Sequence, residues 1–112
     1  MYIQSIDSKR TERIIACMRL PPDLPIEWSE EKNQEVIRLR GVSFEEVLEK
    51  IEADQIIDVF PHPNKITYPH QTILVVKIGG YVYAVPFVID GKRIFLKTIY
   101  RSRKLNEIYL SD

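Results

Sequence analysis

The chain has 112 residues, 45% of them hydrophobic and 29% charged, which is typical of one globular domain of ~100–150 residues. Its 16 basic and 16 acidic residues cancel, and no apolar run approaches the ~18 residues that a membrane span requires. The start MYIQSIDSKR lacks the apolar stretch of a signal peptide, and the single cysteine, Cys17, excludes an internal disulfide, so we expect a cytoplasmic protein without metal or another cofactor.

The first 25 residues are expected to form an N-terminal extension. The apolar residues of 8–20 have the spacing of a short helix, and three prolines within 21–25 then stop any helix and make a stiff, extended linker. The main domain is therefore predicted to span residues 26–112.

Two helices are predicted after the linker. Ser29 is followed by two glutamates, the arrangement of an N-cap with acids in the first turn, and Gly41 ends this helix. Ser43 and Glu46 have the spacing of a capping box for a second helix that ends near Asp54. Apolar residues at helical spacing give the second helix one packing face: Phe44, Val47, Leu48 and Ile51.

The rest of the chain has the signals of an antiparallel meander. Strands are predicted over 56–60, 72–78, 81–89 and 93–101, with a proline-rich loop over 61–69 and two-residue turns at Gly79-Gly80 and Asp90-Gly91. The strand over 81–89 is apolar on both faces, so helices or a partner should cover both. Pro86 lacks a backbone donor and predicts a bulge or an unpaired flank.

A short helix capped by Ser102 completes the chain, with Leu105, Ile108 and Tyr109 as its packing face. The predicted fold class is α+β, with two N-terminal helices packed on a small antiparallel meander sheet and a short C-terminal helix.

Charge is unevenly distributed along the sequence. Residues 1–54 hold 12 acids and 8 bases, whereas residues 55–112 hold 4 acids and 8 bases. Six bases and no acid lie together near the end of the chain: Lys92, Arg93, Lys97, Arg101, Arg103 and Lys104. This concentration favours contact with a polyanion, RNA first. The alternatives are a solvated edge strand protected against aggregation, or pairing with Glu45, Glu49 and Glu52.

Residues 27–33 (EWSEEKN), 41–46 (GVSFEE) and 101–105 (RSRKL) resemble motifs of the BrnT-type toxins. The resemblance covers residues 26–110 and implies a bacterial ribonuclease toxin of RelE-like fold, neutralised by a cognate antitoxin in a heterotetramer. A homodimer is the other assembly that the sequence allows. The family's basic residue before the last turn is replaced here, since 88–90 read Val-Ile-Asp, and Leu105 stands in place of an alanine.

The implied chemistry needs no metal, because arginine and lysine stabilise charge on the phosphate while the RNA 2′-hydroxyl attacks. Regular alternation along 93–101 would put Lys97 and Arg101 on one face, with Tyr100 on the other. We therefore expect Lys97, Arg101 and Tyr100 as catalytic groups, with Tyr109 as an alternative to Tyr100. The expected RNA-binding residues are Arg93, Arg103 and Lys104.

Two other interpretations stay open. One is a non-catalytic module that keeps the fold and binds protein or RNA through the same sheet. His62 and His70 at the ends of the proline loop are a weaker acid–base pair, and two histidines without an acidic or cysteine cluster do not make a metal site.

Overall fold

The fold is known from a computed structural model that describes residue 20 and residues 24–110. Its helices and strands are β1 (Ile26–Trp28), α2 (Glu30–Arg40), α3 (Phe44–Glu52), β2 (Asp58–Pro61), β3 (Thr72–Ile78), β4 (Tyr81–Asp90), β5 (Arg93–Leu96), β6 (Tyr100–Arg101) and α4 (Arg103–Leu110). The α+β class and both N-terminal helices of the main domain are confirmed. The helix expected over 8–20 falls outside the described residues, apart from its last position.

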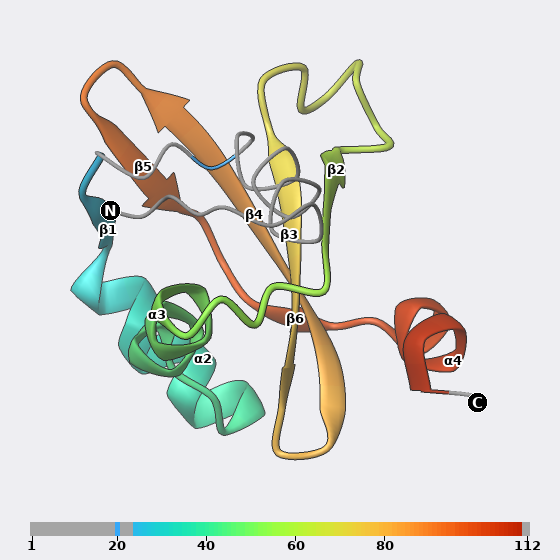
Figure 1. Cartoon of the computed structure of the whole chain (residues 1–112). Helices are drawn as coiled ribbons and strands as arrows, with labels where there is room; N and C mark the ends of the chain where they lie inside the picture. Colours follow the sequence, from blue (N-terminus) through green and yellow to red (C-terminus); the bar gives the residue numbers. More distant parts are fainter. Residues whose placement is uncertain (1–19, 21–23, 111–112) are drawn as a thin grey trace, which may run out of the picture.

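The sheet has the strand order β1-β5-β4-β3-β2, and β6 pairs with β4 beyond the end of β5 (Figure 1). Every pairing is antiparallel except that of β1 with β5, which is parallel. The predicted meander is therefore confirmed. Strand β1 was not expected, because three residues are too few to show the alternation that marks a strand.

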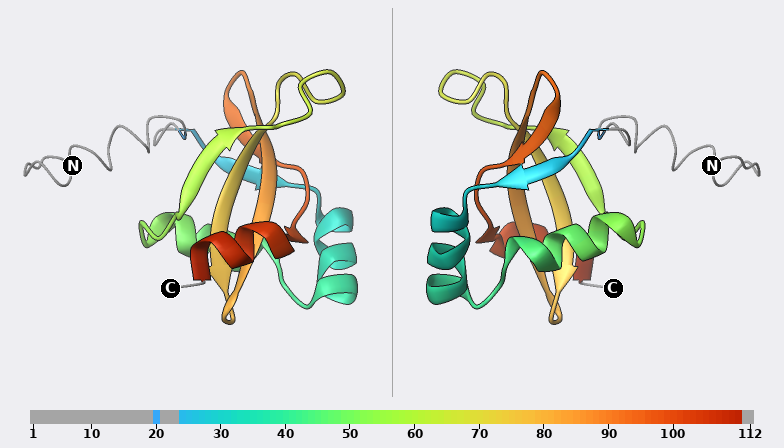
Figure 2. Two further views of the ribbon diagram at one scale, coloured as in Figure 1. Left: turned by 90° about the vertical axis from the view of Figure 1, so that its right-hand side faces the viewer. Right: turned by 90° about the vertical axis from the view of Figure 1, so that its left-hand side faces the viewer.

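Helices cover the two faces of the sheet from opposite sides (Figure 2). Helices α2 and α3 pack with the larger core cluster, whereas Leu105 and Tyr109 of α4 pack against a smaller one. Alternate residues of β4 enter the two clusters: Tyr83, Val85 and Phe87 the larger, Val82 and Ala84 the smaller. The two-faced apolar strand is thus covered by helices of its own chain, one of the predicted alternatives.

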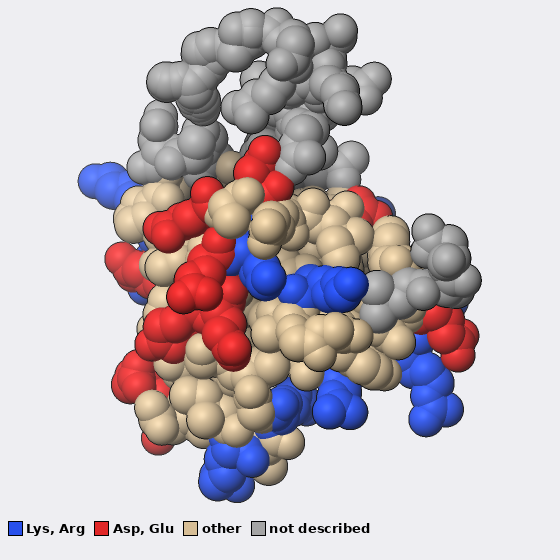
Figure 3. Space-filling model, turned by 60° about the horizontal axis from the view of Figure 1, so that its bottom comes forward, with Lys and Arg blue, Asp and Glu red and all other residues tan. Residues whose placement is uncertain are grey.

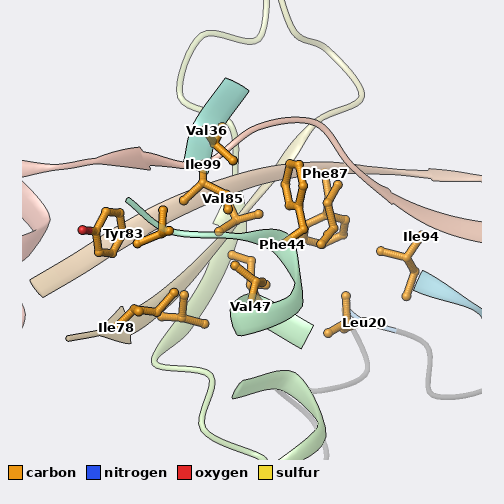
Figure 4. Packing of buried hydrophobic residues seen from close by; sticks show 14 of the residues in the cluster. Leu20, Val36, Phe44, Val47, Ile78, Tyr83, Val85, Phe87, Ile94 and Ile99 are labelled. Carbon is orange, nitrogen blue, oxygen red and sulfur yellow. The ribbon is translucent and has the colours of Figure 1, made fainter. Parts of the chain in front are cut away.

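The larger cluster is centred on Phe44, the first residue of α3, which is fully buried (Figure 4). Phe87, Ile94 and Leu96 join it from the sheet. Leu20 also belongs to this cluster, and Leu24 packs against it. Residues before position 26 therefore contribute to the core of the main domain.

The N-caps predicted for α2 and α3 are both present. The Ser29 hydroxyl accepts a hydrogen bond from the Lys32 N–H at 3.2 Å, and Ser43 forms the full capping box with Glu46. Gly41 ends α2 with φ of 71°, a left-handed conformation that glycine adopts without steric cost.

A buried side chain joins α2 to α3. Asn33 is only 1% exposed, and its amide oxygen accepts from the Phe44 N–H at 2.8 Å while its amide nitrogen donates to Glu45 at 2.9 Å. The ring of Trp28 stacks on that of Phe44 with centroids 5.6 Å apart. The segments 27–33 and 41–46 therefore meet in one joint, whose members pack or cap.

Two details of the sheet and the last helix differ from expectation. The second hairpin turns at Gly91-Lys92, one residue later than predicted, because Asp90 already pairs with Arg93. Ile108 was assigned to the packing face of the last helix but is 57% exposed, whereas Leu105 and Tyr109 pack against the smaller cluster.

Candidate nucleic-acid interface

The predicted last strand is interrupted by a bulge. Phe87 pairs with Leu96 and Ala84 with Tyr100, so two residues of β4 face three residues, 97–99, on the opposite strand. The bulge lies beside Pro86, whose carbonyl accepts from the Lys97 N–H at 2.8 Å and which has no N–H to return. A bulge or an unpaired flank was expected at Pro86: the extra residue lies on the neighbouring strand instead, and Val85 and Pro86 have no ladder partner on that side.

One extra residue reverses the direction of every side chain that follows it. Ile99 consequently enters the same cluster as Ile94 and Leu96, although regular alternation would place it on the other face. Tyr100 turns toward the cluster that α4 covers, and Arg101 pairs with Tyr83, a residue of the opposite cluster.

The prediction that Lys97 and Arg101 share a face is therefore wrong. The Lys97 ammonium lies 5.4 Å from the ring centroid of Phe95, which pairs with Val88 and shares with it the face of α4. The Arg101 guanidinium lies 4.9 Å from the ring centroid of Tyr81, which packs against the α2–α3 cluster. A single phosphate cannot be held between these two side chains on opposite faces of a sheet.

The Arg93 guanidinium forms ion pairs with two acidic side chains. Its guanidinium donates to Glu27 of the adjacent β1 at 3.0 Å and to Asp90 at 3.3 Å. The hydrogen bond that Arg93 donates to Glu27 raises the pKa of Arg93 most, and the one that it donates to Asp90 raises it further. Since both pairs are exposed, RNA can compete for Arg93, but only by displacing two carboxylates.

Within residue 20 and residues 24–110, no ion pair joins the basic segment to Glu45, Glu49 or Glu52, so that alternative is wrong. Arg93 pairs with Glu27 and Asp90, whereas Glu45 of α3 accepts from Asn33, which lowers the pKa of that carboxyl. In Figure 3 the acidic side chains gather on one side of the visible face, and the basic ones stand in separate groups. On this face the cations do not form one continuous strip.

The start of α4 carries the remaining expected RNA-binding residues. Ser102 caps this helix by accepting from the Leu105 N–H at 3.1 Å. Arg103 and Lys104 follow in the first turn, and both are exposed. Within residue 20 and residues 24–110, no carboxylate lies within 4 Å of the charged groups of Lys97, Arg103 or Lys104.

Both tyrosine hydroxyls stay protonated at neutral pH and can donate hydrogen bonds. Burial raises the pKa of the Tyr100 hydroxyl. Tyr109 donates to Asp58 of β2 at 2.5 Å, and this hydrogen bond raises its pKa to about 12. Tyr109 therefore links α4 to the sheet, which leaves Tyr100 as the better candidate for a catalytic tyrosine.

The proline loop brings together residues that the sequence did not pair. The ring of His62 lies 4.5 Å from that of Tyr68, centroid to centroid, and its Nδ1 accepts from the Asn64 N–H at 3.0 Å. No hydrogen bond or ring contact joins His62 to His70 within this fully described loop. The structure therefore gives no support to the interpretation of the two histidines as an acid–base pair.

Asn33 is the residue that sequence reasoning missed. Asparagine is unfavourable inside a helix unless its side chain has a partner, so its position four residues after the Ser29 cap was the available signal.

Comparisons with known proteins identified no relative of this chain. No family model matches the chain, and neither the curated proteins nor the solved structures compared with it contain a match. Among the described residues, no three His, Cys, Asp or Glu side chains are grouped as a metal site would need. In the same part of the chain, no helix is both long and apolar enough to cross a membrane.

Proposed function

We propose that this chain is a cytoplasmic RNA-cleaving toxin of a bacterial toxin–antitoxin pair, acting without a metal ion. The observation that carries the proposal is that Lys97 and Tyr100 lie on the face of the sheet that α4 covers, and that the start of α4 bears Arg103 and Lys104. Residues 59–106 contain eight basic side chains and one acid, Asp90, so this half of the chain favours a polyanion.

The residues in this group suit the chemistry of 2′-hydroxyl attack. Lys97 supplies a positive charge to the scissile phosphate, because its ammonium has no carboxylate partner in the described chain. Burial raises the pKa of Tyr100, so its hydroxyl stays protonated at neutral pH and donates a hydrogen bond to the leaving 5′-oxygen, while water takes the proton of the attacking 2′-hydroxyl and protonates the leaving oxygen. Arg103 and Lys104 are placed to bind neighbouring phosphates.

The resemblance to BrnT-type toxins adds the expected partner. Its first two motifs coincide with the Trp28–Phe44 stack and the Asn33 joint, so they support a related fold rather than the activity. The proposed antitoxin would be encoded beside this gene, and a short neighbouring frame with the pattern of a ribbon-helix-helix protein would support it.

The test uses purified chain, free of any bound antitoxin, incubated with RNA in the presence of EDTA. We expect cleavage by the unaltered chain and a loss of rate of roughly 100-fold for Lys97→Ala, the size typical of a lost charge-stabilising donor. Tyr100→Phe should also slow cleavage. Arg101→Ala is the matched control, since it removes a cation from the opposite face, and it should cost much less.

RNA that stays intact under these conditions would contradict the nuclease proposal. Equal losses for Lys97→Ala and Arg101→Ala would contradict the assignment of the α4 face, because only one of these cations lies on it.

A second candidate is a binding module that keeps the fold without the chemistry. The division of Lys97 and Arg101 between two faces favours it, because it removes one of the expected catalytic cations from the site. RNA that is bound by the chain and released uncut would support this candidate, as would normal growth when the gene is expressed alone.

A further inference from the structure

The loop between β2 and β3 is an ordered, exposed structure that the proposed cleavage chemistry does not use. Hydrogen bonds hold it internally: the Tyr68 N–H donates to the Asn64 carbonyl at 2.9 Å and the Thr67 N–H to the Asn64 side chain at 3.1 Å. The His62 N–H donates to Gln71 at 3.0 Å, which closes the base of the loop. Prolines at 61, 63 and 69 restrict it further.

This framework presents an aromatic pair to solvent. His62 and Tyr68 are in ring contact, at 4.5 Å between centroids and 37° between planes, and Tyr68 remains 41% exposed. A solvent-facing aromatic ring held by a rigid loop is what single-strand-binding proteins use to stack an unpaired base.

Within the loop the charge is of one sign, whereas the nearby β4–β5 turn carries Lys92 beside the Asp90–Arg93 ion pair. No aspartate or glutamate occurs between residues 59 and 89, and Lys65 lies exposed in the loop. The loop and the β4–β5 turn, which carries the exposed Lys92, project from the same end of the sheet (Figures 1 and 2). β5 then leads from that turn to Lys97.

We propose that His62 and Tyr68 form a stacking platform for an unpaired base of single-stranded RNA, with Lys65 and Lys92 contacting its backbone. The platform rests on the proposed function, since it supplies the RNA-binding part of that activity at a distance from the cleaving group. A strand that runs along β5 would reach both.

The test measures binding of the full chain to a fluorescent 2′-O-methyl oligoribonucleotide, which lacks the attacking hydroxyl and so stays intact. Tyr68→Leu should weaken binding by roughly 5- to 150-fold, the range for one base–aromatic stack. Tyr68→Phe keeps the ring and should bind normally. Thr67→Ala is the neighbouring control, because only the backbone N–H of Thr67 takes part in the loop.

Two further measurements separate stacking from charge and from loop folding. An abasic oligomer of the same length should bind the unaltered chain and Tyr68→Leu equally. Lys65→Ala should lower the slope of log affinity against log salt by about one, whereas Tyr68→Leu should leave that slope unchanged.

Each outcome is decisive. Unchanged affinity of Tyr68→Leu, or an equal loss toward the abasic oligomer, would overturn the platform while leaving the proposed function intact. An unaltered chain that binds no RNA would overturn the proposed function itself. Loss of antitoxin binding by Tyr68→Leu, with RNA binding preserved, would assign the loop to a protein partner and overturn the platform.

Discussion

The α2–α3 joint and the C-terminal segment 93–110 are held together in different ways. In the joint, Asn33 is buried and both ends of its amide are hydrogen-bonded. In the C-terminal segment, the contacts of the cations are exposed: Arg93 lies between two acids, and Lys97 and Arg101 lie on aromatic rings. The joint is therefore built for stability, and the segment is free to exchange its contacts for those of a ligand.

The difference bears on how sequence motifs are used. The two segments that resemble toxin motifs most closely, 27–33 and 41–46, meet in the joint, where their side chains cap and pack. A match to such motifs is evidence for the fold. Evidence for the activity must come from the C-terminal segment, whose contacts cost little to replace.

The largest effect is expected from breaking the joint. Asn33→Ala removes a buried acceptor from the Phe44 N–H at the start of α3, together with the donor to Glu45. We expect a loss of about 2–3 kcal/mol in the free energy of unfolding, measured by urea denaturation. Gln34→Ala is the matched control: its amide bonds Glu30 in solvent, and its loss should stay within about 0.5 kcal/mol. Equal losses for both variants would contradict a special role for the joint.

Low pH should reduce the difference in stability between the unaltered chain and Asn33→Ala. The hydrogen bond from Asn33 lowers the pKa of Glu45, so the stability from this carboxylate is present above its ordinary pKa and is lost as pH falls through the lowered one. The gap in stability between the unaltered chain and Asn33→Ala should therefore narrow in strong acid. Denaturation curves at stepwise lower pH measure this, and a constant gap would contradict it.

A smaller effect is expected where α4 is fastened to the sheet. Tyr109→Phe removes the hydrogen bond to Asp58 on β2 and should cost about 1 kcal/mol, because the ring keeps its packing. Urea denaturation gives this value as well. An unchanged stability would mean that Leu105 and the Asn106 contact to the Val82 N–H hold the helix alone.

The hydrogen bond between Tyr109 and Asp58 should also make the stability depend on pH in the alkaline range. The pKa of Tyr109 is raised to about 12, so its contribution is complete below the ordinary tyrosine value of about 10 and disappears as pH rises through 12. The stability gap between the unaltered chain and Tyr109→Phe should thus close between these pH values. Since the other titrating groups are common to both proteins, the difference isolates Tyr109.

Most of the fold was predictable because its signals are local. Capping residues fix where α2 and α3 begin, and paired or single glycines with positive φ fix the hairpins. The parallel strand β1 was not predictable, because it depends on Pro25 and Ile26 meeting Ile94, a residue distant in sequence. Short strands formed by distant pairing leave no periodic signal.

The candidate site was predictable only in part, for a related reason. Sequence shows that Lys97, Tyr100 and Arg101 are close along the chain, but the bulge beside Pro86 decides which face each one takes. Pro86 indicated a bulge, but the sequence did not show that the extra residue would lie on the neighbouring strand. An uncertainty of one residue in the position of the bulge leaves the fold unchanged, but it decides on which face of the sheet each side chain of the candidate site lies.

The smallest effect is expected at Arg93, and it tests the difference between the two regions most directly. Arg93→Gln removes exposed contacts to Glu27 and Asp90, and exposed ion pairs stabilise little because water and salt screen them. The urea midpoint should shift less than that of Tyr109→Phe, and the shift should vanish in high salt. If Arg93 instead exchanges its acids for phosphate, the variant should still weaken RNA binding at low salt. A large, salt-independent loss of stability would place Arg93 with the α2–α3 joint as a structural residue, and the C-terminal segment would then have one cation fewer to offer a ligand.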